Sequence, residues 1–156
     1  VARSTQVRQE NFLAMLKEKP LPPFPGVVEL MSAALDSDNF KVAIATSSTR
    51  EKSQAVLDSA GIPYKKLVYV TGSDVSRKKP DPELFVTAAK KVAVPPQKCV
   101  VIEDAPNGIE AAHRAGCRCI AVTNSASADK LSQADLIVAS LKAVSIDKVR
   151  GLISGR

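Results

Sequence analysis

Two adjacent carboxylates, Glu103 and Asp104, directly follow an uninterrupted apolar run at residues 100–102. Continuous Val and Ile residues are typical of strands buried on both faces of a parallel sheet, and ligands bind at the carboxyl ends of such strands. Two acids at that point could hold a hard cation such as Mg²⁺, which prefers oxygen ligands. The alternative is that Asp104 only caps the next helix and Glu103 is solvated, which is the better interpretation of an isolated pair. The metal hypothesis therefore depends on other residues of the chain.

A cluster of hydroxyls, Thr46-Ser47-Ser48, follows the short apolar run at residues 42–45. Hydroxyls and backbone amides that lead into a helix N-terminus can hold a phosphate oxygen. Because Ser and Thr also cap helices routinely, this cluster alone is a weak indication of phosphate binding.

A basic turn with two prolines, Lys78-Lys79-Pro80-Asp81-Pro82, is the third candidate. The prolines restrict the backbone on both sides of Asp81, so Lys79 is held in a defined place. An ammonium presented rigidly to a phosphate is used in phosphoryl transfer. On these residues alone, a solvated loop lysine is an equally good interpretation.

The formal net charge of +6 at pH 7 raises the question of a nucleic-acid ligand. The basic residues are scattered in pairs, however, and a chain with no Trp and 2 Tyr offers no platform on which bases could stack. A small anionic ligand fits the charge equally well. For these reasons we expect no nucleic-acid partner. No apolar run approaches the length of a membrane span, so we expect no membrane partner either.

The 3 cysteines are an odd number, which argues against a disulfide framework. Cysteines without a disulfide framework favour a reducing compartment, the cytoplasm or a reducing organelle such as a plastid. Cys117, Cys119 and His113 lack the further ligands that a tetrahedral zinc site would need. We interpret the cysteines as small buried residues.

Strand and helix patterns alternate along most of the chain. Apolar spacing predicts a helix at 5–19, prolines at 20, 22, 23 and 25 form a stiff connector, and a second helix follows at 27–35. Strands are predicted at 42–45, 67–70, 99–102, 119–122 and 136–138, and helices before Gly61, at 82–92, at 109–115 and at 146–153. Such alternation implies right-handed crossovers and a parallel sheet with helices on both faces, an α/β, Rossmann-like architecture.

In their order and spacing, three segments resemble motifs of the haloacid dehalogenase-like hydrolases, in the branch of β-phosphoglucomutase-like and CbbY-like phosphatases. They are Ala43-Ile44-Ala45-Thr46-Ser47-Ser48, Lys79-Pro80-Asp81-Pro82-Glu83-Leu84-Phe85 and Val101-Ile102-Glu103-Asp104-Ala105-Pro106-Asn107-Gly108-Ile109. The resemblance implies that residues 1–25 are the end of a helical cap domain and its hinge. Residues 26–156 would then be the family's α/β core without its first strand.

The resemblance also implies roles for single residues. Thr46 would bind the transferring phosphoryl group, with Ser47 and Ser48 beside it. Lys79 would bridge that group and the nucleophile. Glu103 and Asp104 would hold Mg²⁺ directly or through water.

One departure from the family pattern stands against these matches. The family's nucleophile lies in an Asp-x-Asp-x-Thr motif on the first strand, and this sequence has no such motif. Its one Asp-x-Asp, Asp36-Ser37-Asp38, precedes a predicted strand and is interpreted as a turn. Without that aspartate, covalent catalysis has no nucleophile.

The family's first strand lies between the strands predicted at 42–45 and 99–102. We expect these two to stand about 10 Å apart, two strand spacings, with the gap filled by residues outside this sequence or by another copy. Direct pairing would indicate an independent domain.

The expected function of the intact protein is Mg²⁺-dependent hydrolysis of a small phosphate ester, such as a sugar phosphate. The alternatives are a phosphomutase of the same family and a non-catalytic remnant that binds phosphate or a partner. This chain alone is expected to be inactive.

Overall fold

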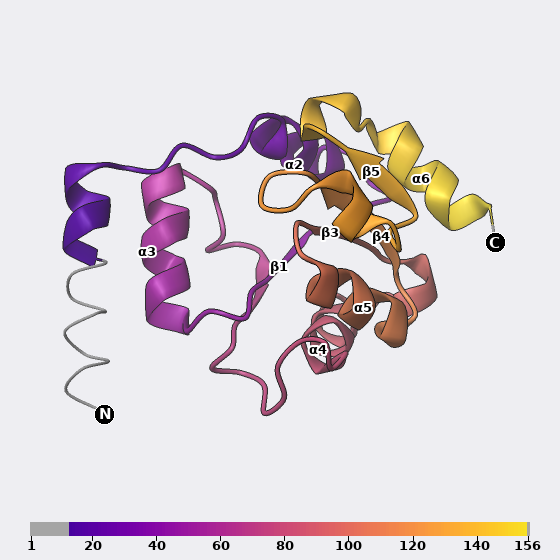
Figure 1. Ribbon diagram of the computed structural model, residues 1–156, viewed down its shortest axis with the longest axis horizontal. Helices are drawn as coiled ribbons and strands as arrows, with labels where there is room; N and C mark the ends of the chain where they lie inside the picture. The colour runs from indigo at the N-terminus through magenta and orange to yellow at the C-terminus, as the bar shows by residue number, and fades with distance from the viewer. Residues whose placement is uncertain (1–12, 156) are drawn as a thin grey trace.

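The computed structural model describes residues 13–155, which form an α/β fold (Figure 1). The strands are β1 Ala43–Ala45, β2 Val68–Val70, β3 Val100–Glu103, β4 Arg118–Val122 and β5 Leu136–Val138. The helices are α2 Val27–Leu35, α3 Arg50–Ala60, α4 Glu83–Val92, α5 Pro106–Ala115 and α6 Ile146–Ser154, and three short 3₁₀ helices are η1 Pro96–Lys98, η2 Ala128–Leu131 and η3 Leu141–Ala143. Each predicted strand is therefore confirmed to within one residue at either end.

Local signals explain most helix boundaries. Thr49 begins α3 by accepting a hydrogen bond from the backbone of Lys52, and the left-handed Gly61 ends it. The prediction was wrong at the start of α5, which begins at Pro106 because proline suits the first helical position and Ala105 before it is extended. In α4, Pro82 is the residue before the helix rather than part of it. Of the helix predicted at 5–19, residues 13–18 are helical, and the earlier residues lie outside the described part.

The strands form two separate parallel ladders, β1-β2 and β3-β4-β5. Ala45 pairs with Val70 in the first ladder, and Glu103 pairs with Ala121 in the second. The parallel arrangement is confirmed. The expectation that β1 and β3 do not pair directly is confirmed as well.

Two apolar clusters, one on each face of the strands, hold the ladders. Cys119 and Ala121 of β4 pack into the cluster formed with α4 and α5, whereas Ile120 and Val122 pack into the cluster on the other face. This alternation is the period of two expected of a strand. The first cluster contains residues of both ladders, and α4 contacts β1, β2 and α5, so the ladders share one core although their strands do not pair. The predicted coverage of both faces is confirmed.

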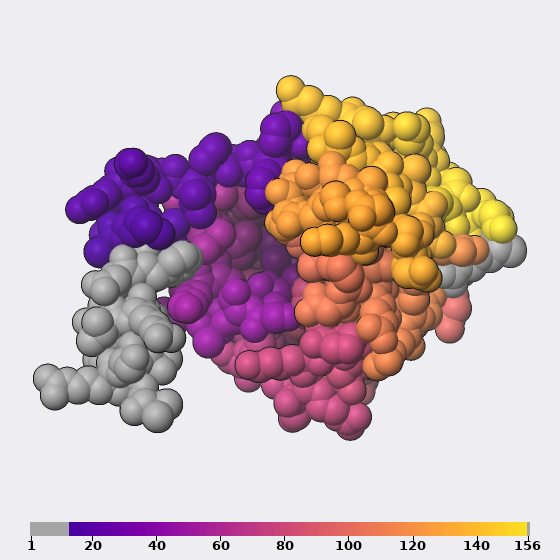
Figure 2. All heavy atoms as spheres, in the orientation of Figure 1, coloured from indigo at the N-terminus to yellow at the C-terminus, as the bar shows by residue number. Residues whose placement is uncertain are grey.

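The helical residues 13–18 lie beside α3, and the coil around Pro20 and Pro23 leads from them to α2 (Figure 1). In the space-filling view this segment stands to one side of the α/β body (Figure 2). One hydrogen bond, from the Leu21 backbone to Ser59 Oγ at 2.9 Å, fixes the connector to α3. None of the helices within residues 13–155 has the length and apolar character needed to cross a lipid bilayer.

Candidate active site

The carboxyl end of β3 carries an ion pair between Lys79 and Glu103. Lys79 Nζ donates to Glu103 Oε2 at 3.0 Å, and the two side chains are 14% and 9% exposed. Burial raises the pKa of Glu103, and the charge of Lys79 opposes that rise. Lys79 is therefore not the solvated loop lysine that the sequence left as an alternative, because its ammonium is largely buried.

The turn that carries Lys79 is held by acidic side chains as well as by its prolines. The Glu83 carboxylate accepts hydrogen bonds from the backbone of Ser76 at 3.0 Å and of Arg77 at 2.8 Å. Asp81 Oδ1 in turn accepts from the Glu83 backbone at 2.9 Å. The sequence indicated the rigidity through the prolines, whereas the role of Glu83 depends on a contact between the turn and α4.

Gly108, on the first turn of α5, lies against the Glu103 carboxylate. A Cβ atom at this position would be 2.0 Å from Glu103 Cδ and 2.1 Å from Oε2. A larger residue here would overlap the Glu103 side chain in its present position, and glycine leaves the room for it. The packing fixes Glu103 on one side while Lys79 fixes it on the other.

Asp104 lies next to this pair and accepts a hydrogen bond from Ser125 Oγ at 2.7 Å. Ser125 follows β4 and was not predicted as a site residue; a polar residue after a strand end is the signal that could have found it. Within residues 13–155, no group of three or more His, Cys, Asp or Glu side chains is placed to hold a metal ion. Mg²⁺ usually takes one or two carboxylates together with waters and phosphate oxygens, so Asp104 fits such a site. Because Glu103 is engaged by Lys79, Asp104 would be the better placed direct ligand of such an ion.

Thr46, Ser47 and Ser48 form a turn at the carboxyl end of β1. Thr46 Oγ1 accepts a hydrogen bond from the Ser48 backbone at 3.2 Å, and the side chains of Ser47 and Ser48 are exposed. The turn packs against Gly72, whose N–H donates to Ser48 O at 2.8 Å. A Cβ at Gly72 would be 2.2 Å from Ser47 O, so this contact also requires glycine.

The loop after β2 is a further polar segment that sequence reasoning missed. Asp74 Oδ2 accepts from the Thr71 backbone at 2.8 Å and forms an ion pair with Arg50 at 2.6 Å. The Thr71 backbone N–H is the main cause that lowers the pKa of Asp74, and Arg50 contributes. The same signal that identified Thr46, polar residues directly after a strand, was present here.

The predicted residues fall into two groups. Lys79, Glu103 and Asp104 are together at the end of β3, while Thr46 to Ser48 lie at the end of β1. Among the described residues, no hydrogen bond or ion pair connects the two groups.

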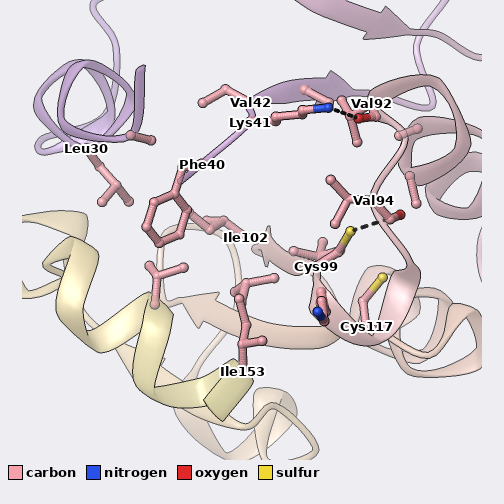
Figure 3. Close-up of a pocket in the computed structure, with 18 of the residues that line it drawn as sticks. Leu30, Phe40, Lys41, Val42, Val92, Val94, Cys99, Ile102, Cys117 and Ile153 are labelled. Atoms are coloured by element: carbon pink, nitrogen blue, oxygen red, sulfur yellow. Dashed lines mark hydrogen bonds between the residues drawn. The ribbon is translucent and has the colours of Figure 1, made fainter. Parts of the chain in front are cut away.

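A groove with a volume of about 690 Å³ lies between β1 and β3 (Figure 3). It is lined by Ala43 to Ala45 of β1 and by Val100 to Ile102 of β3. Apolar side chains of α2, α4 and α6, among them Leu30, Phe85 and Val149, close it on both faces. Ile102 is 41% exposed, a high value for an isoleucine in the interior of an α/β fold.

Comparison with known proteins identifies the fold. The sequence pattern of the haloacid dehalogenase-like hydrolase family matches residues 2–116. Hexitol phosphatase A of Escherichia coli is 36% identical over 124 residues, which are 80% of this chain and 56% of that protein. A mutant of CbbY from Rhodobacter sphaeroides, in complex with xylulose-(1,5)bisphosphate, superposes with a TM-score of 0.85 at 26% identity over 95% of this chain and 68% of that one. β-Phosphoglucomutase from Clostridium difficile gives a TM-score of 0.83 at 25% identity over 99% of this chain and 67% of that one.

This chain thus spans about half the length of the curated relatives it matches, 56% in the case of hexitol phosphatase A. The match in sequence pattern covers well over half of the chain, and the likeness in structure covers nearly all of it. The chain belongs to the haloacid dehalogenase-like hydrolases.

Proposed function

We propose that the complete protein is a Mg²⁺-dependent phosphatase that hydrolyses a small phosphate ester, a sugar phosphate, through an aspartyl-phosphate whose aspartate lies outside residues 1–156. The observation that carries the proposal is the buried Lys79–Glu103 pair with Asp104 beside it, at the carboxyl end of β3. The phosphatase activity in the name of one relative and the sugar bisphosphate bound to another support the substrate class.

Residues on both sides of the groove would donate hydrogen bonds to the phosphoryl group. An ammonium has three protons to donate; Lys79 directs one to Glu103 and keeps two for phosphoryl oxygens. The Thr46 hydroxyl and the exposed Ser47 and Ser48 supply further donors from the other side of the groove. Glu103 holds the ammonium in place but also lowers the net positive charge at the site.

Mg²⁺ would neutralise the negative charge that develops on the phosphoryl oxygens. Asp104 would hold the Mg²⁺ ion, and the hydrogen bond from Ser125 to Asp104 Oδ2 would orient the carboxylate. Glu103 would act on the metal through water.

We propose further that one extended strand, lying parallel between β1 and β3, completes the sheet. Each of these strands has a pairing partner on one side and the groove on the other. Such edges carry unsatisfied backbone donors and acceptors that a further strand would pair. An aspartate just past the carboxyl end of that strand would lie between Thr46 and Lys79, where the nucleophile is needed. Either the segment that precedes this chain in the complete protein or another copy could supply the strand, and residues 1–25 would be the end of the cap domain.

A phosphomutase is the second candidate, because the fold matches that of β-phosphoglucomutase. A non-catalytic phosphate-binding or partner-binding protein is the third. The proposed compartment remains the cytoplasm or a reducing organelle such as a plastid, supported by the 3 reduced cysteines.

The test compares residues 1–156 with the same chain extended by its upstream coding sequence, using p-nitrophenyl phosphate with and without Mg²⁺. We expect turnover by the extended protein only. Lys79→Ala in the extended protein should reduce kcat by a factor of about 10² or more, since it removes a charge that stabilises the transition state. The matched control is Lys78→Ala, which removes the exposed neighbouring charge and should leave kcat nearly unchanged.

Asp104→Asn in the extended protein should raise the Mg²⁺ concentration needed for half-maximal rate. Equal Mg²⁺ dependence of Asp104→Asn and the parent would reject the metal assignment. Turnover by residues 1–156, confirmed by mass to begin at Val1 and abolished by Lys79→Ala, would reject the external nucleophile. Conversion of a sugar phosphate to its isomer without release of phosphate would identify the phosphomutase.

A further inference from the structure

Cys99 and Cys117 face one another at the amino end of the β3–β4 ladder. Val100 of β3 pairs with Arg118 of β4, and the Arg118 backbone donates to Cys99 O at 3.1 Å. Cys99 and Cys117, the residues just before this pair, are therefore opposite each other. Neighbouring strands are about 4.8 Å apart, and the Cα atoms of a disulfide lie about 4.4–6.8 Å apart. The register thus places the backbones of this pair at a separation that a disulfide can span.

Both side chains point to the same face of the sheet, beneath α4 and α5. Cys117 belongs to the buried cluster there and Cys99 packs against it. The Cys99 thiol lies 3.4 Å from Pro95 O, and the neighbouring Cys117 thiol lowers its pKa. Both residues line the groove, and Figure 3 shows the Cys99 thiol directed toward the Val94 carbonyl with Cys117 nearby.

The exposure of the three cysteines differs. Cys99 is half-buried, so the interpretation of every cysteine as a small buried residue was wrong for this one. Cys117 is 3% exposed, and Cys119 is fully buried. Burial raises the pKa of the Cys119 thiol to about 12, which makes it a poor nucleophile. Cys119, in β4 two residues after Cys117, therefore serves as an internal control.

We propose that Cys99 and Cys117 form a redox pair that hydrogen peroxide converts reversibly into an intramolecular disulfide. The Cys99 thiolate attacks one peroxide oxygen, the O–O bond breaks, and hydroxide leaves and takes up a proton. The Cys117 sulfur then attacks the sulfur of the Cys99 sulfenic acid, the S–O bond breaks, and water leaves as the S–S bond forms. Two thiols and one peroxide give one disulfide and two waters, a two-electron oxidation of the protein. In a reducing compartment the pair rests as thiols and the bond is transient.

The sequence allows a direct test, because trypsin cuts after Lys98, Arg114, Arg118 and Lys130 and leaves each cysteine in its own peptide. The folded chain is treated with peroxide, blocked with iodoacetamide under denaturing conditions, digested and analysed by mass spectrometry. We expect peptide 99–114 linked to peptide 115–118, with Cys119 alkylated in peptide 119–130. Dithiothreitol before blocking should return all three peptides to the alkylated form.

Cys99→Ser and Cys117→Ser should each abolish the linked product, while Cys119→Ala should retain it, with circular dichroism confirming the fold of each. If a variant fails to fold, the peptide map of the unsubstituted chain decides by itself. A link to the 119–130 peptide, a link between two molecules, or sulfinic acid on Cys99 with Cys117 still alkylated would each overturn the proposal.

Discussion

The Glu103 carboxylate is 9% exposed and is neutralised by one ammonium, that of Lys79. A buried pair of this kind adds little net stability, because both charges lose their hydration. Loss of one partner costs much more, since the other charge remains buried without compensation. The pair therefore points to a requirement of the site and not of the fold.

A double-mutant cycle tests this view. Lys79→Met should lower the free energy of unfolding by about 3–5 kcal/mol, because it leaves Glu103 unpaired. Lys79→Met combined with Glu103→Gln should recover most of that loss. Urea denaturation in EDTA measures the free energy of unfolding of the parent, the two single variants Lys79→Met and Glu103→Gln, and the double variant. The exposed Lys78→Met is the control. A double variant as unstable as Lys79→Met would show that Lys79 stabilises through another contact, such as that of its ammonium with the Phe85 ring.

Gly108 offers a second test at the scale of one residue. Gly108→Ala places a methyl 2.0 Å from Glu103 Cδ and should cost about 1–3 kcal/mol through overpacking. The control is Gly151→Ala in α6, which meets no atom within 4 Å and should stabilise by about 0.5–1 kcal/mol. Thermal melts of both variants measure the difference. Equal effects of the two substitutions would contradict the close contact between α5 and Glu103.

At the scale of secondary structure, the sequence was most informative where local chemistry decides. The apolar runs located every strand because a buried parallel strand has few polar positions. Polar residues after strand ends identified Thr46, Glu103 and Asp104, since the edge of the sheet is fixed once the strands are parallel. Lys79 was identified by the two prolines of its turn. The supporting roles of Glu83 and Gly108 were missed, because they depend on how α4 and α5 pack against the turn and β3. Ser125 carried the same signal as Thr46, but its contact with Asp104 depends on the packing of the loop after β4. The position of Cys99 opposite Cys117 could likewise not be predicted, because it depends on the register of β3 and β4.

The unpaired edge of β3 predicts a pattern of amide hydrogen exchange. Since the Arg118 backbone donates to Cys99 O, the alternation of the ladder directs the amides of Val100 and Ile102 toward the groove. These two should exchange faster than the amide of Ile120, which lies in the central strand of its ladder. Exchange followed by NMR on residues 1–156 measures this. Once a strand completes the sheet, we expect Val100 and Ile102 to become protected, and equal rates before and after would argue against pairing in the groove.

For the molecule as a whole, the groove exposes apolar surface that an α/β core normally buries between two paired strands. Residues 1–156 alone should therefore bind the dye ANS, and the extended protein should bind it weakly. Ile102→Thr should reduce the fluorescence of the isolated chain because Ile102 lines the groove, whereas Val86→Thr, at an equally exposed position outside the groove lining, should not.

The concentration dependence of the dye signal separates the two sources of the missing strand. If another copy fills the groove, fluorescence per chain should fall as protein concentration rises and a dimer appears in sedimentation. If the upstream segment of the same chain fills it, the signal of residues 1–156 should stay proportional to concentration. Weak dye binding by monomeric residues 1–156 would mean that the groove closes on its own, and the sheet would then need no further strand.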